Sequence, residues 1–196
     1  QEFQTSLPVK NDFIKSWLNA HQLKRPISIR QSSRFSAPLT YGVFRPVILM
    51  PTSTDWENTK ALQYVLAHEY VHIRRFDSIT KLVLIAALCV HWFNPLVWVM
   101  YILANRDIEL SCDEAVVRLF GETTKAAYAR ALISMEETKS GFAPLCNNFN
   151  KNAIEERITA IMKFKKASIF SLALALALVV GVTTAFATSA IATATD

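Results

Sequence analysis

Hydrophobic residues recur at helical spacing near the N-terminus, change to the pattern of short strands, and return to helical spacing for the rest of the chain. Over residues 9–20 this period predicts an amphipathic helix. A cluster of Ser, Thr and Asp offers candidate N-caps, with Glu57 placed for a capping box, so a long helix is predicted to begin there and run to Phe76. Gly121 is predicted to end a later helix.

Three short segments before the long helix are rich in β-branched or aromatic side chains and are separated by Pro, Ser and Gly. They comprise residues 27–32, 39–44 and 46–51. We expect them to form a small N-terminal antiparallel sheet. The fold class is therefore predicted as α+β, a mostly helical domain with this sheet at its start.

Two long stretches carry no charged residue. One is residues 82–104; the other lies within residues 167–188 and is long enough to cross the hydrocarbon core of a bilayer. Basic residues precede the second stretch and none follows it. The positive-inside rule then predicts that residues 1–166 are cytosolic, 167–188 form a transmembrane helix, and 189–196 are a short extracytoplasmic tail. A secretory signal is disfavoured because such a signal belongs at the N-terminus.

His68, Glu69 and His72 form an HExxH pattern within the long predicted helix. Because positions i and i+4 lie on one face of a helix, both imidazoles can bind the same metal ion. Glu69 borders this face and is placed as a general base that takes a proton from water. The alternative, a surface helix with two solvated histidines, is disfavoured because the helix is otherwise apolar. The pattern predicts one Zn²⁺ per chain.

A catalytic zinc needs a third protein ligand and an open position for water. Five downstream residues are candidates: Asp77, His91, Glu109, Asp113 and Glu114. Asp77 lies too close to the histidines along the chain and is expected to cap a helix or pair with an adjacent arginine. His91 is favoured as a core histidine over a ligand. Glu109 and Asp113 share a helix face, which predicts Glu109 as the third ligand and Asp113 as the carboxylate that orients a ligand histidine.

The uncharged run must allow Glu109 to reach the histidines. One straight helix through it would measure about 35 Å, cross the bilayer and separate the ligands. Asn94 is a good N-cap and Pro95 is favoured at the first helical position. We therefore predict two helices, over about residues 78–92 and 95–119, folded back as a hairpin. Its apolar tip is suited to the cytoplasmic membrane interface or to packing against other helices.

Composition narrows the functional classes. A hydrophobic fraction of 52% indicates membrane contact. The net charge of +5 comes from scattered basic residues, not from a stripe, which argues against direct binding of nucleic acid. Three cysteines without paired spacing indicate a reducing compartment. Because the chain lacks an initiator Met and begins with polar residues, we expect a fragment of a longer protein.

Four segments carry a resemblance to a known family: GVFRPVILMP (42–51), HEYVHIRRFD (68–77), HWFNPLVW (91–98) and ELSCDEAV (109–116). In this order they resemble the BlaR/MecR type of membrane-bound antirepressor metallopeptidases, and the likeness covers nearly all of residues 25–187. Such proteins hold zinc through the HExxH histidines and the glutamate of an E-x-x-C-D-E segment, a gluzincin arrangement. The resemblance thus implies His68, His72 and Glu109 as ligands and Glu69 as base.

The resemblance also implies a function. It implies a signal transducer of antibiotic resistance in the bacterial cell membrane, whose protease domain on the cytoplasmic side cleaves a transcriptional repressor or the protein itself. The implied partners are that repressor, the lipid bilayer and other transmembrane helices of the full-length protein. Extended substrate is expected to pair with the edge of the small sheet, within residues 42–51.

Several alternatives remain open at this stage. Ser78 and Lys81 match the S-x-x-K pattern of serine acylases, but the S-x-N element of those enzymes is missing. A non-catalytic zinc-containing membrane scaffold that binds a regulatory partner would be indicated by a filled four-ligand metal site. A soluble zinc protease would be indicated by detergent-free solubility. The group that stabilises the oxyanion is not assigned, and Tyr128, Arg130 and His91 are candidates.

Overall fold

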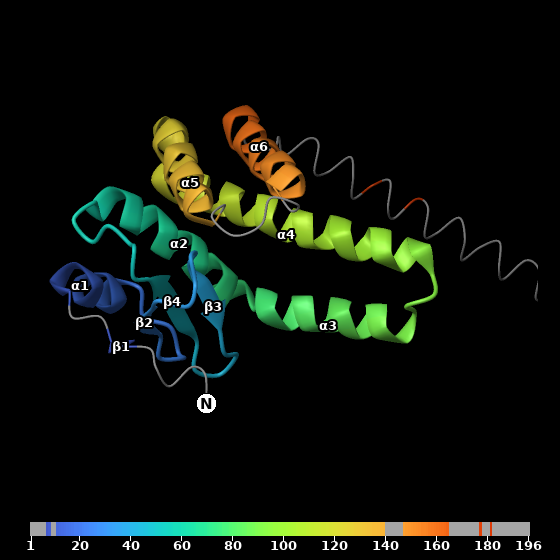
Figure 1. Cartoon of the computed structure of the whole chain (residues 1–196), viewed down its shortest axis with the longest axis horizontal. Helices are drawn as coiled ribbons and strands as arrows, with labels where there is room; N and C mark the ends of the chain where they lie inside the picture. The colour runs from blue at the N-terminus through green and yellow to red at the C-terminus, as the bar shows by residue number, and fades with distance from the viewer. Residues whose placement is uncertain (1–6, 9–10, 140–146, 165–176, 178–180, 182–196) are drawn as a thin grey trace, which may run out of the picture. The chain divides into compact units, whose positions relative to one another are not determined.

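The computed structural model describes residues 7, 8, 11–139, 147–164, 177 and 181 (Figure 1). The chain divides into two compact units, residues 1–163 and 164–196. In the first unit the elements run in the order β1 (Leu7–Pro8), α1 (Asp12–Ala20), β2 (Ser28–Ser32), β3 (Leu39–Tyr41), β4 (Val47–Pro51), α2 (Thr59–Arg75), α3 (Asp77–Val90), α4 (Pro95–Phe120), η2 (Glu122–Thr124), α5 (Lys125–Lys139) and α6 (Asn147–Lys163).

The predicted transmembrane helix and the tail lie outside the described residues, apart from Ala177 and Gly181. Of the helices that the structure does describe, none is both long and apolar enough to cross a membrane. The division of the chain into a cytosolic domain, a span and a tail therefore remains a prediction.

The sheet has the order β1-β2-β4-β3 and is mixed, so the prediction of an antiparallel sheet was wrong in one pairing. β2 runs parallel to β4, whereas β1 with β2 and β3 with β4 are antiparallel. β3 reverses the chain once and the turn after it reverses the chain again, so β4 returns beside β2 in the same direction. The consecutive buried residues Ile48, Leu49 and Met50 fit this central position, because such a strand is covered on both faces.

The core joins the sheet to α1 and α2. Ile14 and Trp17 of α1 pack with Ile48 of β4 and Leu66 of α2 in one buried cluster. α1 confirms the predicted N-terminal amphipathic helix. The predicted capping box at α2 was wrong: Asn58 is the N-cap, and its side chain accepts a hydrogen bond from the amide of Ala61. Because Glu57 precedes this cap, it cannot take the third helical position that a capping box requires.

The helical hairpin is confirmed. α3 ends at Val90 and α4 begins at Pro95, with the side chain of Asn94 accepting a hydrogen bond from the amide of Leu96. In Figure 1 the two helices lie side by side, and α4 continues back to pass α2, α5 and α6. Gly121 ends α4 as predicted, and α6 begins at Asn147, a few residues inside the predicted loop.

Phe76 makes the sharp corner between α2 and α3. It has a left-handed backbone with φ 60°, and its amide donates to the carbonyls of His72 and Ile73. The guanidinium of Arg25 lies 3.8 Å from the centre of the Phe76 ring and also donates to the carbonyls of Ile73 and Val43. Arg25 therefore ties this corner to the turn between β3 and β4.

We predict that Gly42→Ala destabilises the domain by more than Gly121→Ala does. Both glycines have positive φ, which costs a residue with a Cβ atom about 1–3 kcal/mol. A Cβ at Gly42 would also lie 2.6 Å from the carbonyl oxygen of Arg45, whereas a Cβ at Gly121 meets nothing within 4 Å. Denaturant unfolding followed by circular dichroism would compare the two variants. Equal losses, or a smaller loss for Gly42→Ala, would contradict the tight turn.

Candidate metal centre

α2 places the HExxH residues at the base of the hairpin. His68 and Glu69 are buried, and the side chain of His72 is only 12% exposed. The Nε2 atoms of His68 and His72 lie 3.1 Å apart, so both rings direct these nitrogens to the same point. The spacing on one helix face therefore produces the convergence that the sequence predicted.

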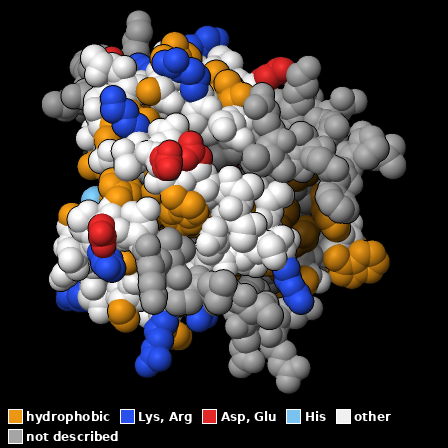
Figure 2. Space-filling model, turned by 60° about the vertical axis from the view of Figure 1, so that its left-hand side comes forward, with side chains coloured by type: hydrophobic (Ala, Val, Ile, Leu, Met, Phe, Trp, Pro, Cys, Tyr) orange, Lys and Arg blue, Asp and Glu red, His pale blue; other side chains and the backbone are white. Residues whose placement is uncertain are grey.

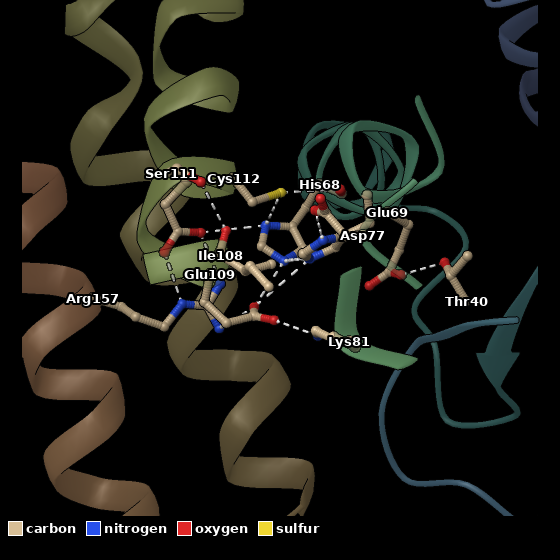
Figure 3. Close-up of polar contacts among 12 residues, drawn as sticks. Thr40, His68, Glu69, Asp77, Lys81, Ile108, Glu109, Ser111, Cys112 and Arg157 are labelled. Carbon is tan, nitrogen blue, oxygen red and sulfur yellow. Dashed lines mark hydrogen bonds and ion pairs between the residues drawn. The ribbon is translucent and has the colours of Figure 1, made fainter. Parts of the chain in front are cut away.

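α4 adds the carboxylate of Glu109 to this point (Figure 3). Its Oε2 atom lies 3.5 Å from Nε2 of His68 and 3.7 Å from Nε2 of His72. Ligand atoms at about 2.0–2.1 Å from a tetrahedral zinc stand about 3.3–3.4 Å from one another. The two nitrogens and the carboxylate oxygen are close to that spacing, so the residues present fit a zinc ion with one position left open.

Cys112 offers a competing donor. One nitrogen of His68, one of His72 and the sulfur of Cys112 lie within 4.8 Å of one another. However, the thiol contacts His68 at Nδ1, at 3.5 Å, and at the carbonyl oxygen, at 3.3 Å. It thus contacts the other nitrogen of the ring, not Nε2. Because Nδ1 also faces a hydroxyl and a carboxylate, we favour the set that contains Glu109.

Each histidine is held at Nδ1 by a partner from another element. Asp77 bonds Nδ1 of His72 at 2.7 Å, and Tyr128 bonds Nδ1 of His68 at 2.9 Å. The hydroxyl of Tyr128 donates to Asp113, whose carboxylate is itself 3.3 Å from the same nitrogen of His68. Such partners fix the tautomer and the direction of a ligand imidazole. The structure thus brings Asp113 where its predicted role requires.

Arg157 of α6 completes this group. Its Nε and Nη2 atoms each donate to the carboxylate of Asp113 at 2.7 Å. Bidentate pairing of this kind is the strongest arrangement between a guanidinium and a carboxylate. Asp113 is only 1% exposed, and burial would raise its pKa, but Arg157 and His68 hold that pKa below the usual range.

The surroundings of the two rings favour positive charge. Burial alone would lower the pKa of His68, but Tyr128 and Asp113 raise it well above its ordinary value. Burial would likewise lower the pKa of His72, yet the contacts with Cys112 and Glu109 raise it to about 10. Burial would raise the pKa of Glu109, and the two histidines lower it far more. A divalent cation bound between these groups would supply the positive charge that the surrounding acidic side chains stabilise.

A cleft of about 490 Å³ opens beside the ligand atoms. Glu69 lines it, and the hydroxyl of Thr40 in β3 donates a hydrogen bond to the Glu69 carboxylate. Lys81 and Arg157 also line it, and the ammonium of Lys81 lies 3.1 Å from Glu109. The cleft is therefore lined both by a carboxylate, that of Glu69, and by two positively charged side chains, those of Lys81 and Arg157.

Sequence reasoning missed some of these residues. Asp77 was expected to pair with an arginine, and it does lie 3.4 Å from Arg75, but it also orients His72. Its closeness to His72 along the chain could have indicated this contact. The corner at Phe76 turns the chain so that Asp77 faces His72. Lys81 was considered only as part of an acylase motif, and Arg157 gave no local signal.

None of the three candidates for oxyanion stabilisation is among the residues that line the cleft. Tyr128 is buried and bonded to His68, and neither Arg130 nor His91 is among the residues that line the cleft. Arg130 is exposed and donates to the carbonyl of Ala126 within its own helix. His91 is exposed at the end of α3, so the prediction of a core histidine was also wrong. The apolar run is a solvent-exposed hairpin tip in this structure, not a protein core.

Comparisons with known proteins agree with this architecture. Residues 4–161 match the family model described as BlaR1 peptidase M56. Regulatory protein BlaR1 of Bacillus licheniformis is 29% identical over 146 residues, which is 72% of this chain and 24% of that protein. The methicillin resistance mecR1 protein of Staphylococcus aureus is 26% identical over 144 residues, 70% of this chain and 24% of that protein. The chain thus spans about a quarter of the length of these relatives.

We predict that Glu109→Gln and Cys112→Ser affect zinc binding differently. Loss of the carboxylate ligand should lower zinc affinity by more than the about 10–100-fold that removal of an orienting partner costs. Cys112→Ser should change affinity by no more than about tenfold, because the thiol contacts His68 at Nδ1 and at the carbonyl oxygen, not at Nε2. Competition with a chelator would measure both affinities. As an independent check, the absorption spectrum of cobalt-substituted protein should lack a thiolate charge-transfer band. A larger loss of zinc affinity in Cys112→Ser than in Glu109→Gln would instead assign Cys112 as the ligand.

Proposed function

The chain belongs to the BlaR1 peptidase M56 family, and from that premise we propose that it is a zinc-dependent metalloendopeptidase. The observation that carries this proposal is the convergence of His68 Nε2, His72 Nε2 and Glu109 Oε2 within 3.7 Å of one another. Glu69 lies beside them in an open cleft and has no ligand position of its own. A purely structural zinc site is normally closed by a fourth protein ligand.

The mechanism follows from the positions of these side chains. Zinc bound by the three ligands would lower the pKa of water and polarise a peptide carbonyl. Glu69 would accept a proton from the attacking water and donate it to the leaving amine. The hydroxyl of Thr40 holds one oxygen of Glu69, which leaves the other for this transfer. Lys81 and Arg157 line the same cleft, although each already pairs with a carboxylate, and we propose that one of them stabilises the oxyanion.

Extended substrate would bind along β3. The sequence-based expectation placed strand addition within residues 42–51, but residues 42–46 belong to no strand, and β4, which covers 47–51, is paired on both sides. β3 pairs with β4 along one edge, and among the described strands none pairs with its other edge. Leu39 and Thr40 of β3 line the cleft. A peptide added to this edge would run past Glu69 and the ligand atoms.

The biological role proposed here is signal transduction. The relatives are named a regulatory protein and a methicillin resistance protein. We extend this to an antirepressor in the bacterial cell membrane, with its catalytic domain on the cytoplasmic side, that cleaves a transcriptional repressor, itself, or both. The repressor, the lipid bilayer and other transmembrane helices of a longer protein are the proposed partners. A small repressor encoded beside this gene would identify the substrate.

A non-catalytic scaffold is the second candidate. The closeness of Cys112 to both histidines is the observation that favours it, because a thiol ligand added to Glu109 would close the metal site. Such a protein would bind its regulatory partner without cutting it. The geometry of Cys112 at Nδ1 weighs against this arrangement.

We predict that Glu69→Gln abolishes cleavage while zinc remains bound. Loss of a general base typically costs about 10²–10⁴ in rate. Cleavage of the neighbouring repressor and of the chain itself would be followed by immunoblotting in cells, with zinc content measured on the purified variant. Glu57→Gln, an exposed glutamate before α2, is the matched control. Undiminished cleavage by Glu69→Gln would show that Glu69 is not the general base. Loss of zinc from this variant would show that Glu69 is a metal ligand.

We also predict that Thr40→Val slows cleavage by about tenfold or more, as expected when an orienting hydrogen bond is lost. Valine keeps the shape of threonine but cannot donate to Glu69. Zinc content should be unchanged. Thr54→Val is the matched control, because the hydroxyl of Thr54 donates to the carbonyl of Pro51. Equal activity of the two variants would show that Thr40 does not position the base.

A further inference from the structure

The hairpin of α3 and α4 carries an apolar surface that the proposed chemistry does not use. Residues 82–104 contain no Lys, Arg, Asp or Glu, and the structure buries none of them. Leu96 is 73% exposed, and Trp92 and Phe93 at the tip are each 68% exposed. On the face in Figure 2, hydrophobic side chains stand in groups among Lys, Arg and other residues. An apolar surface of this extent marks an interaction site.

The distribution of these side chains indicates what covers them. Successive helical positions are about 100° apart, so Leu96 and Val99 lie about 60° apart around α4, whereas Trp98 lies about 160° from Leu96 and about 100° from Val99. On α3, Leu82, Val83 and Ile85 are likewise exposed on the sides that face away from α4. A protein partner docked on one face would leave the other faces in water. A helix pair that is apolar on every outward side is typical of immersion in lipid.

Several polar groups of the turn at the tip are hydrogen-bonded within the hairpin. The amide of Asn94 donates to the carbonyl of His91, and the carbonyl of Asn94 accepts from the amide of Val97. The indole of Trp98 donates to the carbonyl of Trp92 at 2.8 Å. In water these bonds could be exchanged for solvent, but in hydrocarbon an unpaired backbone group costs several kcal/mol. These bonds reduce the cost of moving the tip out of water.

The length of the apolar segments matches one leaflet. Residues 82–90 and 95–104 span about 13 Å and 15 Å as helices, and half of a hydrocarbon core of about 30 Å is about 15 Å. Lys81 directly precedes the first apolar segment, and Arg106, which pairs with Glu156, follows the second by two residues. At that depth they would meet anionic headgroups.

We propose that the hairpin of residues 82–104 is a re-entrant anchor that inserts, tip first, into one leaflet of an anionic bilayer. Lys81 and Glu109 are bonded to each other just outside the apolar segments, so insertion would hold the cleft at the membrane surface. The substrate would then have to present its cleaved segment close to the headgroups. Because insertion requires neither metal nor catalysis, this inference stands apart from the proposed enzymatic activity.

A fluorescent label at the exposed Cys89 tests the insertion. The full chain with Cys146→Ser would be labelled with the environment-sensitive dye NBD, since Cys112 is buried and protected from the reagent. The control places the label at Leu119→Cys with Cys89→Ser and Cys146→Ser; Leu119 is 59% exposed at the opposite end of α4. Both proteins would be reconstituted into vesicles of phosphatidylcholine and phosphatidylglycerol. Doxyl-labelled lipids and aqueous iodide would serve as quenchers.

If the hairpin inserts, doxyl lipids should quench most of the fluorescence of the label at Cys89, and iodide should quench little of it. At residue 119, iodide should quench the label and doxyl lipids should have little effect. The same result is expected with Glu69→Gln, so loss of catalysis cannot imitate loss of insertion. Leu96→Lys should expose the Cys89 label to iodide while circular dichroism keeps its helical signal. Iodide quenching at Cys89 in the unaltered hairpin would overturn the proposal. Shielding from both quenchers, with crosslinks between chains, would overturn it in favour of a protein interface.

Discussion

The structure depends on one constraint: a carboxylate on α4 must reach two imidazoles on α2, although an uncharged run long enough to cross a membrane separates them in the sequence. Asn94 and Pro95 meet it by ending one helix and starting the next in the opposite direction. The return brings Oε2 of Glu109 to 3.5 Å from His68. Two imidazole nitrogens and a carboxylate oxygen this close form a site whose electrostatics favour a cation.

The orienting groups connect this site to elements that supply no ligand. Asp77 reaches His72 from the start of α3, and Tyr128 of α5 reaches His68. Asp113 joins Tyr128 to Arg157 of α6, so the direction of one ligand ring depends on a buried ion pair between α4 and α6. Breaking such a pair leaves an uncompensated buried charge, which typically costs about 3–5 kcal/mol. The packing of α5 and α6 against α4 is therefore also a condition for the geometry of the metal site.

Local patterns were enough to predict the parts of the site that lie on one helix face or at one turn. The i and i+4 spacing of the two histidines and the Asn-Pro step each dictate geometry over a few residues. The left-handed Phe76 could not be anticipated, because a bulky aromatic residue rarely adopts positive φ, and its corner is held by Arg25 from far along the chain. Arg157 was missed for the same reason, since its pairing with Asp113 spans 44 positions. The unbroken apolar β4 did carry a signal of a central strand, and the antiparallel prediction overlooked it.

α4 is divided along its length into two environments. Its first ten residues, 95–104, are uncharged and none is buried, whereas Cys112, Asp113, Val116 and Val117 near its other end are buried in the domain. Glu109 lies between these halves, about one and a half turns beyond Ala104, the last residue of the apolar segment 95–104. A rigid helix fixes the distance between its two ends, so whatever medium receives the first half sets the position of Glu109 relative to that medium. The location of the cleft thus depends on the same hairpin that brings the candidate metal ligands together. A change in the length of this hairpin would both move the cleft and separate these ligands.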